Sequence, residues 1–384
     1  AYNREHALRI KGDLDISSLK QSLQYLTQRH DILRTGYVTE DTVARQYVRQ
    51  DININLDVID LSHLDANAAL IEAVRMATEE SVRPFDLSSG DILRTALYQL
   101  DQNDFIFLMV IHHIAVDGFS EAILTKELAT IYQAIHDGDT IELPELPISY
   151  GDYSVWERAL VENGLLNHQI DYWTEHLKNT PDHLDINCDR PRPGMVSFKG
   201  YTCDFEIEPD LYDRLKHLSS QMGTTLFMTI LAAYQILLYR YSRQNKFVVA
   251  TGVSIRNRPE LENLIGCMAN VIVIKADFSE DLTFESYIKL VSSDALDAYS
   301  NQDLPFEILV EHLHPKRDMS YNPIFQASFD LLQESFTQNL KLKNLDISEL
   351  RLHKNASKYD LGLVMLAGED TLTGSVEYNS DLFD

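Results

Sequence analysis

Seven consecutive apolar residues, 105–111, place the strongest constraint on how this chain folds. A strand with one face in water alternates polar and apolar residues, whereas a strand covered on both faces carries no such alternation. The run therefore predicts a central strand with a layer packed on each side. Other strand-like runs lie at 56–59 and 93–99, and helical periods lie at 15–29 and 66–81. We expect this part of the chain to form a mixed α/β lobe.

The composition changes between residues 179 and 200, where 191–194 holds two prolines and a glycine without an apolar period. Strand and helix patterns then return, with strands expected at 201–207, 247–253 and 271–277 and helices at 210–221 and 225–241. We therefore predict an N-terminal lobe over 1–178, a linker over 179–200 and a C-terminal lobe over 201–384.

Charge and hydropathy exclude several classes of protein. The chain carries 33 Lys and Arg against 59 Asp and Glu, a formal net charge of −26, and such a surface repels phosphate backbones. No apolar run reaches the roughly 18 to 20 residues that span a bilayer. We expect neither a nucleic acid nor a membrane as partner.

The cysteines and the first residues bear on location. Cys188, Cys203 and Cys267 are odd in number and form no Cys-x-x-Cys, which disfavours a disulfide framework and a zinc site and favours a reducing cytoplasmic setting. The chain opens on Ala1 without an initiator Met or the pattern of a secretion signal, so we expect a fragment.

The segment 112–118 is the best candidate for chemistry, because it lies where the buried strand gives way to a helix. Two adjacent histidines on extended backbone point to opposite sides, so His112 and His113 should have different roles. Asp117 or Ser120 could cap the following helix. The alternative for each histidine is a hydrogen-bonded core residue.

Several familiar chemistries lack their motifs. The histidines are adjacent rather than four apart, and no His-Glu-x-x-His is present, so no metal site is expected. The chain contains no Gly-x-Ser-x-Gly elbow of a serine hydrolase, no phosphate-binding P-loop and no Gly-x-Gly-x-x-Gly. Hydrolase and nucleotide chemistry are therefore disfavoured.

Residues 112–118 match the His-His-x-x-x-Asp-Gly motif of the condensation domains of nonribosomal peptide synthetases, relatives of chloramphenicol acetyltransferase. Further segments resemble that family in its own order, at 29–35, 150–156, 189–193, 256–261, 301–307 and 317–323. The resemblance implies two chloramphenicol-acetyltransferase-like lobes that form a V-shaped pseudo-dimer with a tunnel between them.

Two segments depart from the family pattern. The family's first motif is not found near the N-terminus, so we expect its strand to be missing. At 265–271, Gly266 and Asn270 fit the fifth motif, but its aromatic and threonine positions are replaced. We expect these replacements to affect the shape of the implied tunnel but not the fold.

The resemblance implies an acyltransferase that joins a donor acyl thioester to the amine of an acceptor aminoacyl thioester. His113 is expected to face the tunnel and contact the amine, as a base or as an anchor, and His112 to be bonded into the loop. A buried Asp117 needs a cation, and the resemblance implies Arg34 as its partner. Gly118 either keeps the tunnel open or supplies a turn with positive φ.

The same resemblance implies that the domain binds no cofactor of its own. Its substrates arrive on 4′-phosphopantetheine of donor and acceptor carrier domains, next to adenylation or synthase domains of the same assembly line. Ester formation, epimerisation and a non-catalytic role in recruiting carriers or enzymes remain the alternatives.

Overall fold

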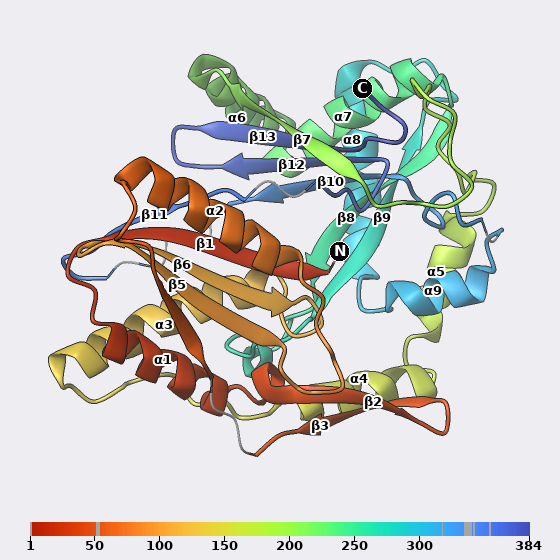
Figure 1. The fold of residues 1–384 in the computed structure, drawn as a ribbon. Helices are drawn as coiled ribbons and strands as arrows, with labels where there is room; N and C mark the ends of the chain where they lie inside the picture. Colours follow the sequence, from red (N-terminus) through yellow and green to blue (C-terminus); the bar gives the residue numbers. More distant parts are fainter. Residues whose placement is uncertain (1, 51–53, 317, 334–339, 341, 353–354) are drawn as a thin grey trace. The chain divides into compact units, whose positions relative to one another are not determined.

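The computed structural model describes residues 2–50, 54–316, 318–333, 340, 342–352 and 355–384 (Figure 1). It contains two compact units, each with one large sheet. The first comprises the described residues of Ala1–Arg158, Arg256–Met268 and Phe336–Lys354, and the second those of Ala159–Ile255, Ala269–Ser335 and Asn355–Asp384. Residues 256–268 thus belong to the first unit, although the residues on both sides of them in the sequence belong to the second.

The first unit is built on a five-stranded sheet in the order β11 (Asp346–Glu349), β1 (Asn3–Lys11), β6 (Asp104–His112), β5 (Leu93–Asp101) and β4 (Leu56–Asp60). All neighbours are antiparallel except β4 and β5. The prediction of a central strand is confirmed, because β6 lies in the middle of this sheet and residues 105–111 are all buried.

Helices cover both faces of that sheet, α2 (Ala66–Val82) on one and α1 (Ile16–Arg29) with α3 (Gly118–Asp137) on the other (Figure 1). Phe105, Phe107, Met109 and Ile111 pack with α1 and α3. Ile106, Leu108 and Val110 pack with the alanines of α2. Two apolar layers explain why β6 shows no alternation. The first unit also contains the short elements η1 (Asp31–Arg34), β2 (Thr35–Glu40), β3 (Val43–Val48) and η2 (Pro259–Leu261). Helix α4 (Tyr150–Glu162) belongs to it as far as Arg158.

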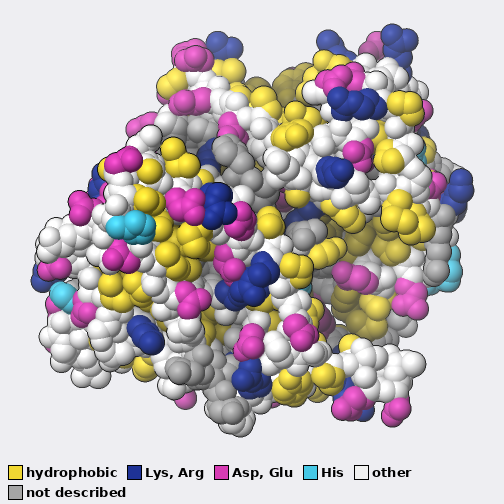
Figure 2. Space-filling view, viewed as in Figure 1, with side chains coloured by type: hydrophobic (Ala, Val, Ile, Leu, Met, Phe, Trp, Pro, Cys, Tyr) yellow, Lys and Arg dark blue, Asp and Glu magenta, His cyan; other side chains and the backbone are white. Residues whose placement is uncertain are grey.

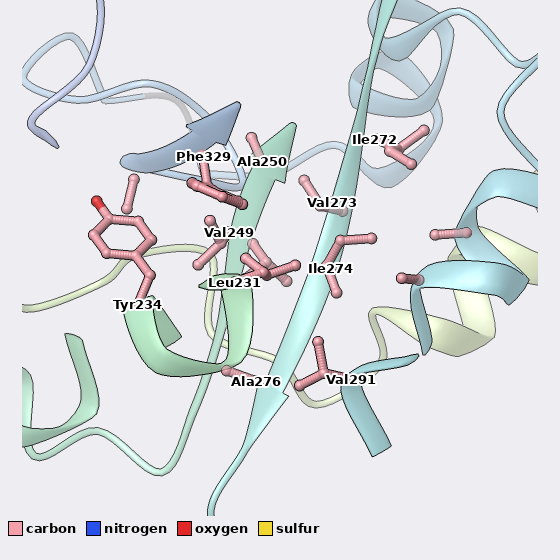
Figure 3. Packing of buried hydrophobic residues seen from close by; sticks show 14 of the residues in the cluster. Leu231, Tyr234, Val249, Ala250, Ile272, Val273, Ile274, Ala276, Val291 and Phe329 are labelled. Carbon is pink, nitrogen blue, oxygen red and sulfur yellow. The ribbon is translucent and has the colours of Figure 1, made fainter. Parts of the chain in front are cut away.

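The second unit contains a six-stranded sheet in the order β7 (Gly200–Ile207), β13 (Leu372–Asn379), β12 (Leu361–Ala367), β10 (Ala327–Leu332), β8 (Lys246–Ser254) and β9 (Ala269–Asp277). Its helices are α5 (Asn167–His176), α6 (Pro209–Met222), α7 (Leu226–Ser242), α8 (Phe284–Ser300) and α9 (Phe306–Leu313). Figure 3 shows its core, where Leu231 of α7 and Val291 of α8 pack against Val249 and Ile274 of the sheet. The strands and helices predicted between 201 and 277 are confirmed.

The unit assignment changes between Arg158 and Ala159, within α4. The expected linker lies inside the second unit, and its residues 179–199 form no helix or strand. The lobe boundary over 179–200 stays a prediction. Arg317, which opens one of the family-like segments, lies outside the described residues.

Within the described residues, no single helix has the length and apolar character to cross a bilayer; α6 and α7 reach both only as a pair bent by 104°.

An ion pair between a buried glutamate and a partly exposed arginine links the first unit's sheet to α3. Arg4 of β1 donates two hydrogen bonds to Glu121, at 2.6 and 2.8 Å, and His6 Nε2 lies 3.3 Å from the same carboxylate. Burial alone would raise the pKa of Glu121, but hydrogen bonding from His6 and the charge of Arg4 outweigh it. The pKa of Glu121 therefore lies well below the ordinary 4.5.

This depressed pKa predicts a pH-dependent contribution to stability. A carboxylate whose pKa is lowered by folding stabilises the fold above its unfolded pKa of about 4.3 and loses that effect as pH falls through the folded pKa. Glu121→Gln should lower the free energy of unfolding by about 1 to 3 kcal/mol at pH 7. In urea titrations the difference from wild type should shrink below pH 4, while Glu79→Gln, at an exposed carboxylate of α2, should change little. A deficit in Glu121→Gln that is the same at every pH would contradict this.

Candidate active site

The two histidines stand at the end of β6 and differ in surroundings. His112 is the last residue of the strand, and its Nδ1 accepts a hydrogen bond from the Ile114 N–H at 3.1 Å. This is the loop contact expected of His112. Burial, and then the charge of neighbouring His113, lower the pKa of His112 below 6.5, so its ring is neutral near pH 7. His112 therefore has a structural setting.

His113 begins the turn that leads to α3. Its backbone N–H donates to the Tyr2 carbonyl at 2.8 Å, and its half-buried ring places Nδ1 3.8 Å from Cys267 Sγ. Both histidines are thus held by backbone hydrogen bonds of the sheet end, but their rings meet different neighbours.

Asp117 caps α3 and is 1 % exposed. Its Oδ1 accepts from Ser120 N at 2.8 Å and Ser120 Oγ at 2.9 Å. Its Oδ2 accepts from Arg256 Nη1 at 2.7 Å and Met268 N at 2.8 Å. With four hydrogen bonds, this carboxylate is fully engaged in holding the loop.

Arg256 joins the segment 256–268 to α3. Its side chain is 6 % exposed, and Nη2 donates to Ser120 Oγ at 2.8 Å and to the Gly266 carbonyl at 3.1 Å. Ser120 Oγ in turn accepts from Gly266 N at 3.0 Å. A buried charge is tolerated only when paired and hydrogen-bonded, and here both partners are.

Arg34 is not the partner of Asp117, so that expectation is wrong. Arg34 lies at the end of η1, where it pairs with Asp31 and donates from Nε to the Thr27 carbonyl at 3.2 Å. Asp31 is three residues earlier in the same tight turn, so the ion pair forms locally. The cation for Asp117 comes from Arg256, 139 residues further along the chain.

The two glycines of the site have opposite surroundings. A Cβ built on Gly118 meets none of the described residues within 4 Å, and its φ is not positive. Of the two alternatives for Gly118, the turn with positive φ is therefore wrong, and the other, that a side chain here would take up open space, stays a prediction. A Cβ built on Gly266 would lie 2.0 Å from the Tyr150 ring, so the loop and α4 touch at this point.

Tyr150 fixes the other end of the loop. Its hydroxyl donates to the Cys267 carbonyl at 2.9 Å. Burial, and then the nearby Cys267, raise the pKa of Tyr150 above its ordinary 10, so the phenol keeps its proton for this bond. Residues 266–268 are thereby tied to α3 and α4 at three consecutive positions.

Sequence reasoning missed Arg256, Tyr150 and Cys267. Residues 256–261 carry a family-like pattern, and the need of a buried carboxylate for a cation was the signal that could have selected Arg256. Among the residues that the structure describes, no group of three His, Cys, Asp or Glu side chains could hold a metal ion.

The contacts of the site predict that Asp117 contributes far more than His113 to the stability of the fold. Asp117→Ala should cost about 3 to 5 kcal/mol in unfolding free energy, because it leaves Arg256 buried without its counter-charge. His113→Ala should cost about 1 kcal/mol or less, since its ring is only half buried. Urea denaturation measures both, and equal losses in the two variants would refute this prediction.

The close contact between Gly266 and Tyr150 of α4 predicts that a side chain at position 266 lowers the stability of the fold. Gly266→Ala should lose about 1 to 3 kcal/mol, because the new methyl group overlaps the Tyr150 ring. Gly151→Ala is the matched control: it lies in the first turn of α4, its new Cβ would make an ordinary 3.5 Å contact, and it should change the stability by about 0.5 kcal/mol or less. Thermal melts of both variants test this, and a neutral Gly266→Ala would show that the loop is not packed as described.

Comparison with known proteins identifies the family. The family model of the condensation domain matches residues 1–384. A linear gramicidin synthase of Brevibacillus parabrevis is 40% identical over 100% of this chain, and phosphinothricin tripeptide synthetase PhsC of Streptomyces viridochromogenes is 33% identical over 100%. This chain spans 7% of the first protein and 35% of the second.

Solved structures agree in fold. The X-domain from teicoplanin biosynthesis superposes with a TM-score of 0.89 at 25% identity, covering 100% of this chain and 86% of that one. A holo four-domain nonribosomal peptide synthetase bound to AMP and glycine gives a TM-score of 0.89 at 23% identity, covering 100% of this chain and 30% of that one. The mixed α/β, chloramphenicol-acetyltransferase-like fold class is thereby confirmed, and the chain belongs to the condensation domain family.

Proposed function

We propose that this domain forms an amide bond between a donor acyl or peptidyl thioester and the amine of an acceptor aminoacyl thioester. The new bond joins the amine nitrogen to the acyl carbon, the acyl carbon–sulfur bond breaks, and the departing thiolate gains the proton that the nitrogen loses. The thioester is already activated, so placing the two reactants supplies much of the rate; well-oriented reactants save about 7 to 11 kcal/mol.

The observation that carries the proposal is the setting of His113. Its ring stands just beyond β6, on a turn whose other end is fixed by the four hydrogen bonds of Asp117. Asp117 has no free oxygen lone pair with which to exchange protons, which supports a structural role for it. His113 is then the group at the reacting centre, as a proton acceptor or as a hydrogen-bonding anchor.

The remaining site residues have supporting roles in this proposal. Gly118 is proposed to leave room for substrate at the N-terminus of α3, supported by the open space around its built Cβ. His112 holds the turn through Ile114. The tunnel between two lobes that family resemblance implies remains a prediction.

The partners proposed are donor and acceptor carrier domains with 4′-phosphopantetheine arms, beside adenylation or synthase domains, in the cytoplasm. The relatives support this, because each is much longer than this chain. Acidic and basic side chains are interspersed over the face seen in Figure 2. With a net charge of −26, docking of acidic carriers would depend on local contacts rather than on the overall field.

A recruitment module is the second candidate. One structural relative at 25% identity is an X-domain solved in complex with OxyB, which supports the idea that this fold also serves binding. Epimerisation and ester formation are the catalytic alternatives, and one assay distinguishes them from amide formation and from recruitment.

The test is a reaction with loaded donor and acceptor carriers, read by mass spectrometry of the intact carriers. Wild type should transfer the acyl group to the acceptor amine, and His113→Ala should be slower by about 10²-fold or more. His63→Ala, at an exposed histidine, is the control and should retain the wild-type rate.

Other outcomes would overturn the proposal. Exchange of the α-hydrogen with deuterated solvent without bond formation would indicate an epimerising domain. Transfer only to hydroxyl acceptors would indicate ester formation. Carrier binding without turnover for any donor would indicate recruitment.

A further inference from the structure

The thiol of Cys267 lies beside the ring of His113. Cys267 Sγ is 3.8 Å from His113 Nδ1, within the range of a hydrogen bond that involves sulfur. Neither the motif of residues 112–118 nor the role proposed for His113 accounts for a thiol at this place. The two residues are 154 positions apart in the sequence.

The backbone on both sides of this thiol is fixed. The Cys267 carbonyl accepts from Tyr150, Gly266 N donates to Ser120 Oγ, and Met268 N donates to Asp117. The network that caps α3 therefore also sets the position of the sulfur. A side chain held in this way can act on the ring of its neighbour.

Acidity decides which partner donates. A thiol with an ordinary pKa of about 8.5 is a far stronger acid than the N–H of a neutral imidazole, and an imidazole nitrogen is a better acceptor than thiol sulfur. The favoured arrangement therefore has Sγ–H donating to Nδ1. Because a neutral imidazole has one N–H, its proton then lies on Nε2.

We propose that Cys267 is a positioning residue that holds neutral His113 in the Nε2–H tautomer, so that His113 meets its substrate as a hydrogen-bond donor. This rests on the function proposed above and selects between its two roles for His113. An Nε2–H group cannot accept the amine proton, but it can donate to the acyl oxygen as negative charge develops there. The proton lost from nitrogen then passes to the departing thiolate.

Other titratable groups surround this pair. His112 adjoins it on β6, and Asp117 is neutralised by Arg256. The phenols of Tyr37 and Tyr150 keep their protons, since burial, and then Cys267, raise the pKa of each. The contact of Cys267 with His113 is made to Nδ1 itself.

Nitrogen-15 NMR of the whole domain with labelled histidine tests the tautomer directly, with His113→Ala to assign the signal. Wild type should show a protonated Nε2 and an unprotonated Nδ1 in the neutral form. Cys267→Ala should mix the tautomers and raise the pKa of His113 by about half to one unit, because the neutral ring loses a donor. Cys267→Ser, which keeps a hydrogen-bond donor at this position, should restore at least part of the wild-type pattern.

Kinetics provide the second readout. Cys267→Ala should lower kcat by about 2- to 10-fold with KM nearly unchanged, because the ring then presents an unprotonated Nε2 to the substrate part of the time. Cys203→Ala, at the exposed cysteine of β7, is the matched control and should keep the wild-type kinetics.

An Nδ1–H tautomer in wild type, or an unchanged His113 signal in Cys267→Ala, would overturn the inference. If Cys267→Ala does not fold, the tautomer of His113 in the wild-type domain still tests the inference: Nε2–H supports it and Nδ1–H overturns it. Absence of amide formation by wild type would refute the proposed function, while the NMR result would stand independently.

Discussion

The ion pair between Asp117 and Arg256 is the interaction on which the site depends. It brings residues 256–268 onto the N-terminus of α3, and the same carboxylate caps that helix. A buried pair of this kind gains little net stability over an apolar contact, but losing one partner is costly. The contribution of this pair is to position the chain: it fixes the end of the turn that begins at His113, and it fixes the segment that carries Cys267.

The sheet of the first unit provides the rigid base for this geometry. β6 is covered on both faces, so its end is held by two apolar layers, and His112 and His113 follow directly from it. The chemistry proposed for His113 would thus be carried by a turn, while the position of that turn is set by a buried strand and a capped helix. Side chains supported in this way lose little conformational freedom when substrates bind.

Local patterns predicted local structure well. The unbroken apolar run identified β6 as central, and helical periods identified α1, α2, α6 and α7, because periodicity records which faces are buried. The His112 contact could also be foreseen, since it lies within two residues. Arg34, the partner that the resemblance implied for Asp117, was wrong, and no local pattern pointed to Arg256, because a pairing across 139 residues depends on the path of the whole chain. The contact of Cys267 with His113 had no local signal either, and the φ of Gly118 was decided by helix α3, which starts at that residue.

The central claim is that Asp117 and Arg256 act as one unit, and a double-mutant cycle on unfolding free energy tests it most directly. Asp117→Asn, Arg256→Gln and the double variant would be compared with wild type. The structure predicts a coupling energy of about 1 to 3 kcal/mol, with the double variant losing less than the sum of the single losses. Additive losses would contradict it, because two residues that do not interact destabilise independently.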